Sequence, residues 1–348
     1  MAALLGALCL SFPACTNAEK RDQWETKPLL QSKVKLSCDK DGNFKTLTLA
    51  DVHAVGKIPE NVEQNIRTLV DRVQPNLVIF TGDNTICGDE ATLRAALDSM
   101  VGYIEQKQIP WCHVYGNHDH EGGMSNEQLQ PIYQSYTYCV SQRGETDVSG
   151  VGNYVLPVYK HDSNEIVSLV WGLDSGAYLS EEDKQTAFSK EKPVYPDKPN
   201  SPYDYIKADQ IQWYYQTSQL LERHYNRKIP GLMAFHIPLQ ETYYAWKNRE
   251  TLPIWTGEKH ESVCASVVNS GLFQALVERG DVKAVVNGHD HINDFMVEYN
   301  GVKLCYSPGV STLTYHDVRM MGGRVFTWHQ DTPTNIQTHV EYLFRTAE

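Results

Sequence analysis

The chain has 348 residues, of which 41% are hydrophobic and 21% are charged, and its formal net charge is −12. This composition is typical of a globular protein with a sizeable core, and the length alone favours about two domains. The acidic balance argues against non-specific binding to nucleic acid or anionic membranes, which depends on Lys and Arg that neutralise phosphates. If the substrate carries phosphate, bound metal ions are a better source of local positive charge than the protein surface.

The first residues form a short apolar segment. Residues 1–16 are apolar except for Ser11 and Thr16, and Cys15 follows a Phe-Pro-Ala run. The segment is too short to span a bilayer and resembles a secretory signal over residues 1–20. A cysteine after a small residue also resembles a bacterial lipoprotein cleavage site, at which Cys15 would be lipidated. We therefore expect an exported protein, either periplasmic or anchored to the membrane through this lipid.

Strands and helices alternate in the first third of the chain. Residues 17–42 are polar and predict an irregular tether that ends in an Asp-Gly turn. Apolar runs predict strands over residues 44–50, 77–80 and 109–115, and apolar residues at helical spacing predict helices over 60–73 and 89–105. A polar cluster follows each strand. This alternation is typical of a layered α/β fold.

The remainder predicts further strands separated by longer connections. A loop with short helices is expected over 120–150, and the later elements are strands 152–159 and 166–173 as a hairpin, helix 209–224, strand 231–235, helix 263–278, strand 282–286, a hairpin turning at Asn300-Gly301 and two final strands. Residues 176–204 and 240–262 are expected as insertions. Because the polar clusters extend from Asp51 to His291, we predict that residues 43–346 form one domain rather than two.

Two further features leave alternatives open. The eight cysteines contain no C-x-x-C pair, so a thiolate zinc knuckle is not expected, but the sequence does not say which of them pair. The second insertion carries four aromatic residues that would form either a wall of the substrate site or a small satellite core: Tyr243, Tyr244, Trp246 and Trp255.

Eight side chains that can bind metals or move protons come directly after predicted strands: Asp51, His53, Asp83, Asn117, His118, His236, His289 and His291. Their oxygen and nitrogen donors suit Mn, Fe or Zn. In Asp51-x-His53 and His289-x-His291, residues i and i+2 project to the same side of an extended chain, so each pair can grip one ion or straddle two. Each short motif alone could be a turn, a helix cap or a packed histidine. The ordered set, with each member after its own strand, predicts a two-metal centre that makes a nucleophile from water.

The order of these motifs resembles the calcineurin-like metallophosphoesterase superfamily, whose pattern runs D-x-H, G-D, G-N-H-[DE], a lone H and G-H-x-H. The matching stretches lie within residues 43–312 and are Asp51-Val52-His53, Gly82-Asp83, Gly116-Asn117-His118-Asp119, His236 and Gly288-His289-Asp290-His291. The stretches that begin at His236 and Gly288 resemble a branch related to purple acid phosphatases. Ile86 stands where those enzymes carry their chromophoric tyrosine, so no tyrosinate–iron absorption band is expected.

The resemblance implies a layered α/β/β/α sandwich of two mixed β-sheets flanked by helices. It also implies two sets of metal ligands joined by a bridging carboxylate: Asp51, His53 and His291 for the first metal, Asn117, His236 and His289 for the second, and Asp83 between them. His118 would be the catalytic residue, which protonates the leaving group or steadies charge on the phosphoryl oxygens. Asp119 would order its loop by hydrogen bonding, and His120 deserves a test because it lies beside the site.

The expected activity is hydrolysis of phosphate esters by in-line attack of a metal-bridging hydroxide, with a phosphomonoesterase favoured over a phosphodiesterase. A nuclease or nucleotide hydrolase on the same centre is a second interpretation, although the acidic balance disfavours long nucleic acid. A third, from another class, is an exported metal-binding protein without activity. The expected partners are a small phosphorylated substrate and two divalent or trivalent ions of Mn, Fe or Zn, with no nucleic acid.

Overall fold

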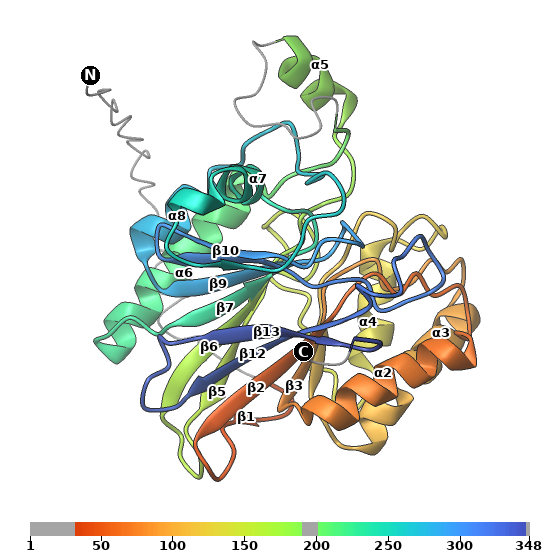
Figure 1. The fold of residues 1–348 in the computed structure, drawn as a ribbon, viewed down its shortest axis with the longest axis horizontal. Coiled ribbons are helices and arrows are strands. Elements are labelled where there is room, and N and C mark those ends of the chain that lie inside the picture. Colours follow the sequence, from red (N-terminus) through yellow and green to blue (C-terminus); the bar gives the residue numbers. More distant parts are fainter. Residues whose placement is uncertain (1–31, 190–200, 346–348) are drawn as a thin grey trace. The chain divides into compact units, whose positions relative to one another are not determined.

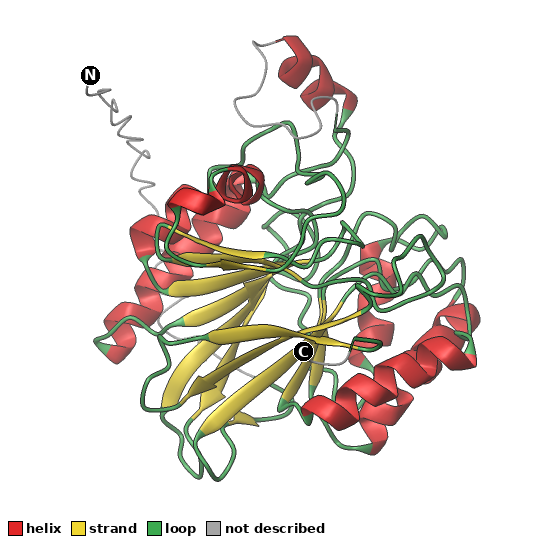
Figure 2. Ribbon diagram, in the orientation of Figure 1, coloured by secondary structure: helices red, strands yellow, loops and turns green. Residues whose placement is uncertain are grey.

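The computed structural model of the chain describes residues 32–189 and 201–345. The expected export signal at residues 1–20, including Cys15, lies outside the described residues and stays a prediction. Over the described ranges, every helix is too short or too polar to cross a bilayer. Residues from 32 onward group into one unit, in which two β-sheets face each other and helices cover their outer sides (Figures 1 and 2).

The smaller sheet has five strands in the order β13-β12-β2-β3-β4. Its strands are β2 (Asn43–Leu49), β3 (Leu77–Phe80), β4 (Trp111–His113), β12 (Gly322–His329) and β13 (Gln337–Tyr342). Strands β2, β3 and β4 are parallel to one another, whereas β12 is antiparallel to β2 and β13 is antiparallel to β12. The carboxyl ends of the three parallel strands therefore meet at one edge of this sheet.

The larger sheet has eight strands in the order β1-β5-β6-β7-β9-β11-β10-β8. Its strands are β1 (Leu36–Ser37), β5 (Tyr154–Tyr159), β6 (Ile166–Gly172), β7 (Gly231–Ala234), β8 (Trp255–Thr256), β9 (Val282–Asn287), β10 (Met296–Tyr299) and β11 (Val302–Tyr306). The central strands β6, β7, β9 and β11 are parallel, and antiparallel partners flank them. Both sheets are mixed, as predicted.

Helices form the two outer layers (Figure 1). The five-stranded sheet is covered by α2 (Glu60–Val73), α3 (Glu90–Gln106) and α4 (Asn126–Gln134), and the eight-stranded sheet by α6 (Ala208–Tyr225) and α8 (Leu272–Arg279). The short helices α5 (Glu181–Ser189), α7 (Gln240–Lys247) and η1 (Arg249–Thr251) belong to the two insertions. The predicted α/β/β/α sandwich is confirmed.

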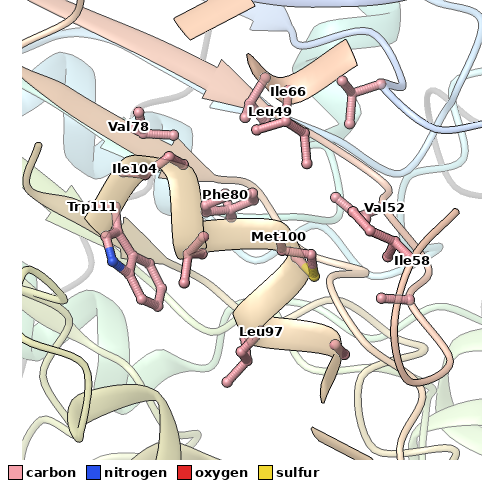
Figure 3. Close-up of a cluster of buried hydrophobic side chains, with 14 of the residues drawn as sticks. Leu49, Val52, Ile58, Ile66, Val78, Phe80, Leu97, Met100, Ile104 and Trp111 are labelled. Carbon is pink, nitrogen blue, oxygen red and sulfur yellow. The ribbon is translucent and has the colours of Figure 1, made fainter. Parts of the chain in front are cut away.

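Side-chain alternation along a single strand shows how two cores are built. Leu77 and Ile79 of β3 belong to the cluster between the two sheets. Val78 and Phe80, on the other face of β3, belong to the cluster under the helices, together with Leu97 of α3 (Figure 3). Because successive strand residues face opposite sides, one strand supports both cores, and each such buried side chain contributes about 1.5–3 kcal/mol.

Most predicted elements agree with the structure, and two are wrong. The helix expected over 263–278 begins only at Leu272, because Gly271 has a left-handed backbone with φ 81°. The preceding backbone instead bonds to neighbouring segments: the Cys264 amide donates to Asp290 Oδ2 (3.1 Å). The expected tether over 17–42 contains β1 in its described part, because Leu36 pairs with Val158 of β5.

The described cysteines are buried. Cys38, Cys87, Cys112, Cys139 and Cys305 are free thiols in the structure. Burial is the largest influence on Cys112 and raises its pKa to about 12, so this thiol stays protonated at neutral pH. These cysteines behave as small apolar side chains of the cores rather than as reactive or metal-binding groups.

Candidate metal centre

The predicted site residues gather where the carboxyl ends of strands from both sheets meet. They come from five strands: Asp51 and His53 follow β2, Asp83 follows β3, Asn117 and His118 follow β4, His236 follows β7, and His289 and His291 follow β9. The seven expected ligands are all buried, whereas the side chain of His118 is 35% exposed. The structure thus separates a buried set of donors from one histidine that solvent can reach.

Six of the expected ligands form two groups that share Asp83. One group contains Asp51, His53, Asp83 and His291, the other contains Asp83, His236 and His289, and the ligand atoms within each group lie within 4.8 Å of one another. Oδ2 of Asp83 is 3.6 Å from Nε2 of His53 and 3.1 Å from Nε2 of His236. This division coincides with the two metal positions expected from the resemblance, with Asp83 between them.

The seventh expected ligand, Asn117, lies beside this shared carboxylate. The backbone amide of the next residue, His118, donates a hydrogen bond to Asp83 Oδ1 (2.8 Å). Gly116, on the other side of Asn117, approaches so closely that a Cβ atom there would lie 2.2 Å from the same oxygen. The loop after β4 is therefore packed directly against the end of β3, and only glycine at position 116 allows this approach.

Four of the expected ligands have an unusual backbone. Asp51, His53, Asp83 and His289 have φ values of 57°, 51°, 50° and 78°, in the left-handed region that non-glycine residues rarely adopt. The two D-x-H residues therefore reach the site through left-handed turns and not through the extended chain that was expected. Such strain costs about 1–3 kcal/mol per residue and is kept where the surroundings over-determine it, often at functional sites.

Glycine also permits the close packing of the two sheets at the site. Gly82 has φ 100°, and a Cβ atom on it would lie 2.4 Å from Nδ1 of His236. The same histidine ring has its Nδ1 2.9 Å from the carbonyl oxygen of Thr81, so Nδ1–H donates and Nε2 turns toward Asp83. The G-D motif of one sheet and the lone histidine of the other are thus in direct contact.

Buried atoms without hydrogen-bond partners test whether metal ions fit this site. Among the described residues no partner is found for Asp51 Oδ2, His53 Nε2, Asn117 Oδ1 or His289 Nε2. A buried polar atom normally has a partner, and leaving one unpaired costs about 1–3 kcal/mol. These orphaned atoms are carboxylate, amide and imidazole donors, which Mn, Fe and Zn accept. The residues present therefore fit a pair of metal ions.

Neighbouring groups orient the imidazoles for such a role. Nδ1 of His291 lies 3.0 Å from the carbonyl oxygen of Tyr315, which leaves Nε2 facing Asp51 Oδ1 at 3.7 Å. The ring of Tyr315 stacks on the same imidazole, with centroids 4.1 Å apart. Metal-binding histidines usually donate their second ring N–H to an oxygen in this way, which fixes the ring and its tautomer.

Burial controls the titration of the cluster. It raises the pKa of Asp51 to about 7, an effect that His236 opposes and Asp83 reinforces. Burial lowers the pKa of His53 to about 4. Burial would also lower the pKa of His236, but the adjacent Asp83 carboxylate raises it to about 9. A nearby cation favours ionised carboxylates and neutral imidazoles, which are the forms that bind metals.

His118 and its neighbours complete the site. Nε2 of His118 is 4.0 Å from Asp83 Oδ2, and Nδ1 is 2.5 Å from Oε2 of Glu121. Asp119 accepts hydrogen bonds from the backbone amides of Gly116 (2.7 Å) and Thr85 (2.9 Å), so it orders the loop as expected. The side chain of the next residue, His120, is exposed.

Three of the four aromatic residues of the second insertion pack on other aromatic rings. Trp246 packs on Phe295 with ring centroids 4.4 Å apart, and Trp255 meets Trp246 edge-on at 5.9 Å. Tyr244 packs on Tyr299 of β10. These contacts support the satellite core for Tyr244 and Trp246, whereas Trp255 lies at its margin with 41% of its surface exposed.

Other tyrosines, which the sequence analysis missed, lie against the expected ligands. The ring of Tyr203 meets that of His289 edge-on, with centroids 4.2 Å apart. Tyr178 stacks on Tyr203 (5.9 Å), and its hydroxyl accepts a hydrogen bond from Nδ2 of Asn117 (3.2 Å). Both tyrosines belong to the insertion at 176–204, whose richness in tyrosine was its only signal.

Comparison with known proteins agrees with this geometry. The calcineurin-like phosphoesterase family matches residues 44–293. The relative named "Probable inactive purple acid phosphatase 29" from Arabidopsis thaliana is 31% identical over 342 residues, which cover 89% of this chain and 79% of the relative. "Phosphatase DCR2" from Saccharomyces cerevisiae is 30% identical over 322 residues, which cover 82% of this chain and 51% of that protein.

A solved structure shares the fold. A dimetal phosphatase from Danio rerio superposes with a TM-score of 0.53 at 14% sequence identity, over 85% of this chain and 98% of that one. At this identity the likeness concerns the fold alone. The family match and the identity to the relatives lead to one conclusion: the chain belongs to the calcineurin-like phosphoesterases, in a branch related to purple acid phosphatases.

Proposed function

We propose that this protein hydrolyses small phosphate esters with the help of two bound metal ions, and that phosphomonoesters are its preferred substrates. One observation supports this most strongly: buried donors without hydrogen-bond partners surround a carboxylate, Asp83, that two groups of ligands share. Unpaired buried donors are costly, and a pair of cations would offset that cost.

Six of the ligand roles follow from the two groups, and the role of Asn117 follows from its buried Oδ1, for which no hydrogen-bond partner is found among the described residues. The proposed ligands are Asp51, His53 and His291 for one metal, Asn117, His236 and His289 for the other, and Asp83 for both. When bound, the two cations neutralise the charge of a phosphate and lower the pKa of a bound water toward neutrality. The metals are Mn, Fe or Zn, and Ile86 in place of the chromophoric tyrosine removes one reason to favour ferric iron.

The protein itself would position the ester and deliver a proton. His118 is the one partly exposed member of the site, and its Nε2 faces the shared carboxylate at 4.0 Å. A phosphate held beside Asp83 would bring its leaving-group oxygen within reach of Nε2–H. Protonation of that oxygen in the transition state is worth about 10²- to 10⁴-fold in rate.

The names of three Arabidopsis relatives include the words "probable inactive", whereas the relative from Saccharomyces cerevisiae is named a phosphatase. A metal-binding protein without activity is therefore the alternative to test. The intact set of donors and the exposed His118 support an enzyme here, because a binding protein needs no histidine beside the metals that can give up a proton.

The test combines metal analysis with turnover. We expect about two equivalents of metal per chain and hydrolysis of 4-nitrophenyl phosphate in the presence of Mn²⁺, with slower hydrolysis of the bis(4-nitrophenyl) diester. For an alkyl phosphate, whose poor leaving group needs a proton, His118→Ala should lower kcat by about 10²- to 10⁴-fold, and the loss should be smaller for 4-nitrophenyl phosphate. His120→Ala, two residues along and exposed, is the matched control and should leave kcat unchanged.

Two outcomes would contradict the proposal. Bound metal without turnover above the His118→Ala background, across several mono- and diesters, would identify a binding protein. Less than one equivalent of bound metal per chain would show that these residues do not form a two-metal centre.

A further inference from the structure

Glu121 accepts hydrogen bonds from two residues of the site. It lies three residues after His118, and its side chain is 36% exposed. Oε2 is 2.5 Å from Nδ1 of His118, and the hydroxyl of Tyr178 donates to Oε1 at 2.9 Å. An ionised carboxylate can only accept hydrogen bonds, so both neighbours must be donors. Their protons are thereby assigned.

The first of these bonds orients His118. Because Nδ1 donates to Glu121, the second ring nitrogen, Nε2, is the one that faces Asp83, 4.0 Å away. Nε2 is then the nitrogen that gives its proton to a leaving group, and Nδ1–H stays with Glu121 throughout. A ring held at one end by a carboxylate loses less entropy when it reaches the reacting atom.

The second bond orients the amide of Asn117. The Tyr178 hydroxyl gives its proton to Glu121, so its oxygen is free to accept, and it accepts from Nδ2 of Asn117 at 3.2 Å. The opposite amide atom, Oδ1, is buried and without a hydrogen-bond partner in the described structure. Because Nδ2 of Asn117 is directed to Tyr178, the amide oxygen Oδ1 is available to bind a metal.

We infer that Glu121 is a positioning residue for two groups at once: it directs Nε2 of His118 toward the substrate and, through Tyr178, turns the oxygen of Asn117 toward the second metal position. The part that concerns His118 rests on the proposed function, whereas the part that concerns Asn117 requires only metal binding. The arrangement also couples the insertion at 176–204 to the loop after β4, because Tyr178 belongs to that insertion.

Glu121→Gln tests the inference with little change in shape. The two neighbours donate to different oxygens of Glu121, and glutamine replaces one of these by an NH₂ group that only donates, so in the same rotamer it cannot accept from both. The matched control is Glu127→Gln, a nearby carboxylate in the first turn of α4 that pairs with Arg143. Tyr178→Phe removes the hydroxyl that links Glu121 to Asn117 and leaves the contact between Glu121 and His118.

The expected loss depends on the leaving group. For an alkyl phosphate, whose poor leaving group needs a proton, Glu121→Gln should lower kcat by about 10- to 100-fold, the usual range for a residue that orients a catalytic group. For 4-nitrophenyl phosphate, whose phenolate leaves without help, the loss should be several-fold smaller. Tyr178→Phe should weaken binding of Zn²⁺ alone, measured by equilibrium dialysis, by about tenfold. Its loss of kcat should be the same for both esters.

A spectroscopic measurement is independent of turnover. A long-range ¹H–¹⁵N spectrum of the Zn²⁺-loaded protein should show a proton fixed on Nδ1 of His118 and a mixture of ring states in Glu121→Gln. The inference is wrong if Glu121→Gln lowers kcat by the same factor for both esters and does not differ from the control Glu127→Gln in its His118 spectrum or its Zn²⁺ affinity. Glu121 would then have only a structural role. If the wild type hydrolyses no ester, the proposed function fails, while the spectrum and Zn²⁺ affinity still decide the role of Glu121.

Discussion

The two sheets contribute different things to the site. The five-stranded sheet supplies both carboxylates, Asp51 and Asp83, and also His53, Asn117 and His118, all within a few residues of a strand end. The eight-stranded sheet supplies three imidazoles, from the loops after β7 and β9. It also carries both insertions, after β6 and β7, and the first of them places Tyr203 against His289.

From this difference we expect the two halves to have separate roles, with the five-stranded half supplying the carboxylates that bind the metals and the eight-stranded half selecting the substrate. Negative charge, which attracts cations, comes from short and strained turns that leave little room for change. Both insertions belong to the eight-stranded half, where they follow the adjacent strands β6 and β7 (Figure 1). We therefore expect changes at the strand ends of the five-stranded half to reduce metal binding, and changes in the first insertion of the eight-stranded half to alter which ester is preferred.

The largest effect should come from the carboxylate that the two groups share. Asp83→Asn removes the one negative side chain near both metal positions, so activity should fall by about 10³-fold or more, beyond the 10- to 100-fold typical of residues outside the coordination shell. Elemental analysis should show less than one equivalent of metal. Asp51→Asn, which belongs to one group only, should retain about one equivalent. Equal metal content in the two variants would contradict a shared ligand.

A glycine in the five-stranded half gives the next largest effect. A Cβ at Gly116 would lie 2.2 Å from Asp83 Oδ1, so Gly116→Ala should lower the free energy of unfolding by about 1–3 kcal/mol and reduce metal binding. Gly102→Ala in α3 is the control, because no atom lies within 4 Å of its added Cβ. Removing a helical glycine there should stabilise the protein by about 1 kcal/mol in urea unfolding. If both variants changed the free energy of unfolding in the same direction, the close packing of this loop would be contradicted.

Changes in the eight-stranded half should alter selectivity more than rate. Tyr203→Ala removes a ring beside His289, so we expect the ratio of kcat/KM between an aryl and an alkyl phosphate to change by about tenfold. Trp246→Ala, in the satellite core, should lower the melting temperature and leave this ratio unchanged. The separation of chemistry from selectivity would fail if Trp246→Ala shifted the ratio and Tyr203→Ala did not.

The smallest effect concerns pH. Burial lowers the pKa of His113, on β4, to about 3, whereas an unfolded histidine has a pKa of about 6.5. Below pH about 6.5 the unfolded state binds a proton at this histidine that the folded state does not bind, so the free energy of unfolding decreases as the pH is lowered. This residue should lower the free energy of unfolding by about 1 kcal/mol when the pH is changed from 6.5 to 5.5. In urea unfolding at both pH values, His113→Phe should lose less stability than the wild type, while exposed His120→Ala should behave like the wild type.

Several features were predictable because they depend on residues close together in the chain. Apolar spacing over 60–73 and the run at 77–80 predict α2 and β3 with the bounds that the structure has. The polar residues after each strand were also predictable, since parallel strands bring their carboxyl ends to one edge. Eight of the residues at the site were therefore named from sequence, although the backbone of the pairs Asp51-x-His53 and His289-x-His291 was expected to be extended.

Other features were decided only by the tertiary structure. The hydroxyl of Tyr178 reaches Glu121 across 57 residues of sequence, and no local pattern marks either residue as a partner. The left-handed turns at Asp51 and Asp83 depend on loops from two sheets pressing together, as Gly82 does against His236. The physical reason is that periodicity is a local property of the chain, whereas the fit between loops is set by how one sheet packs on the other.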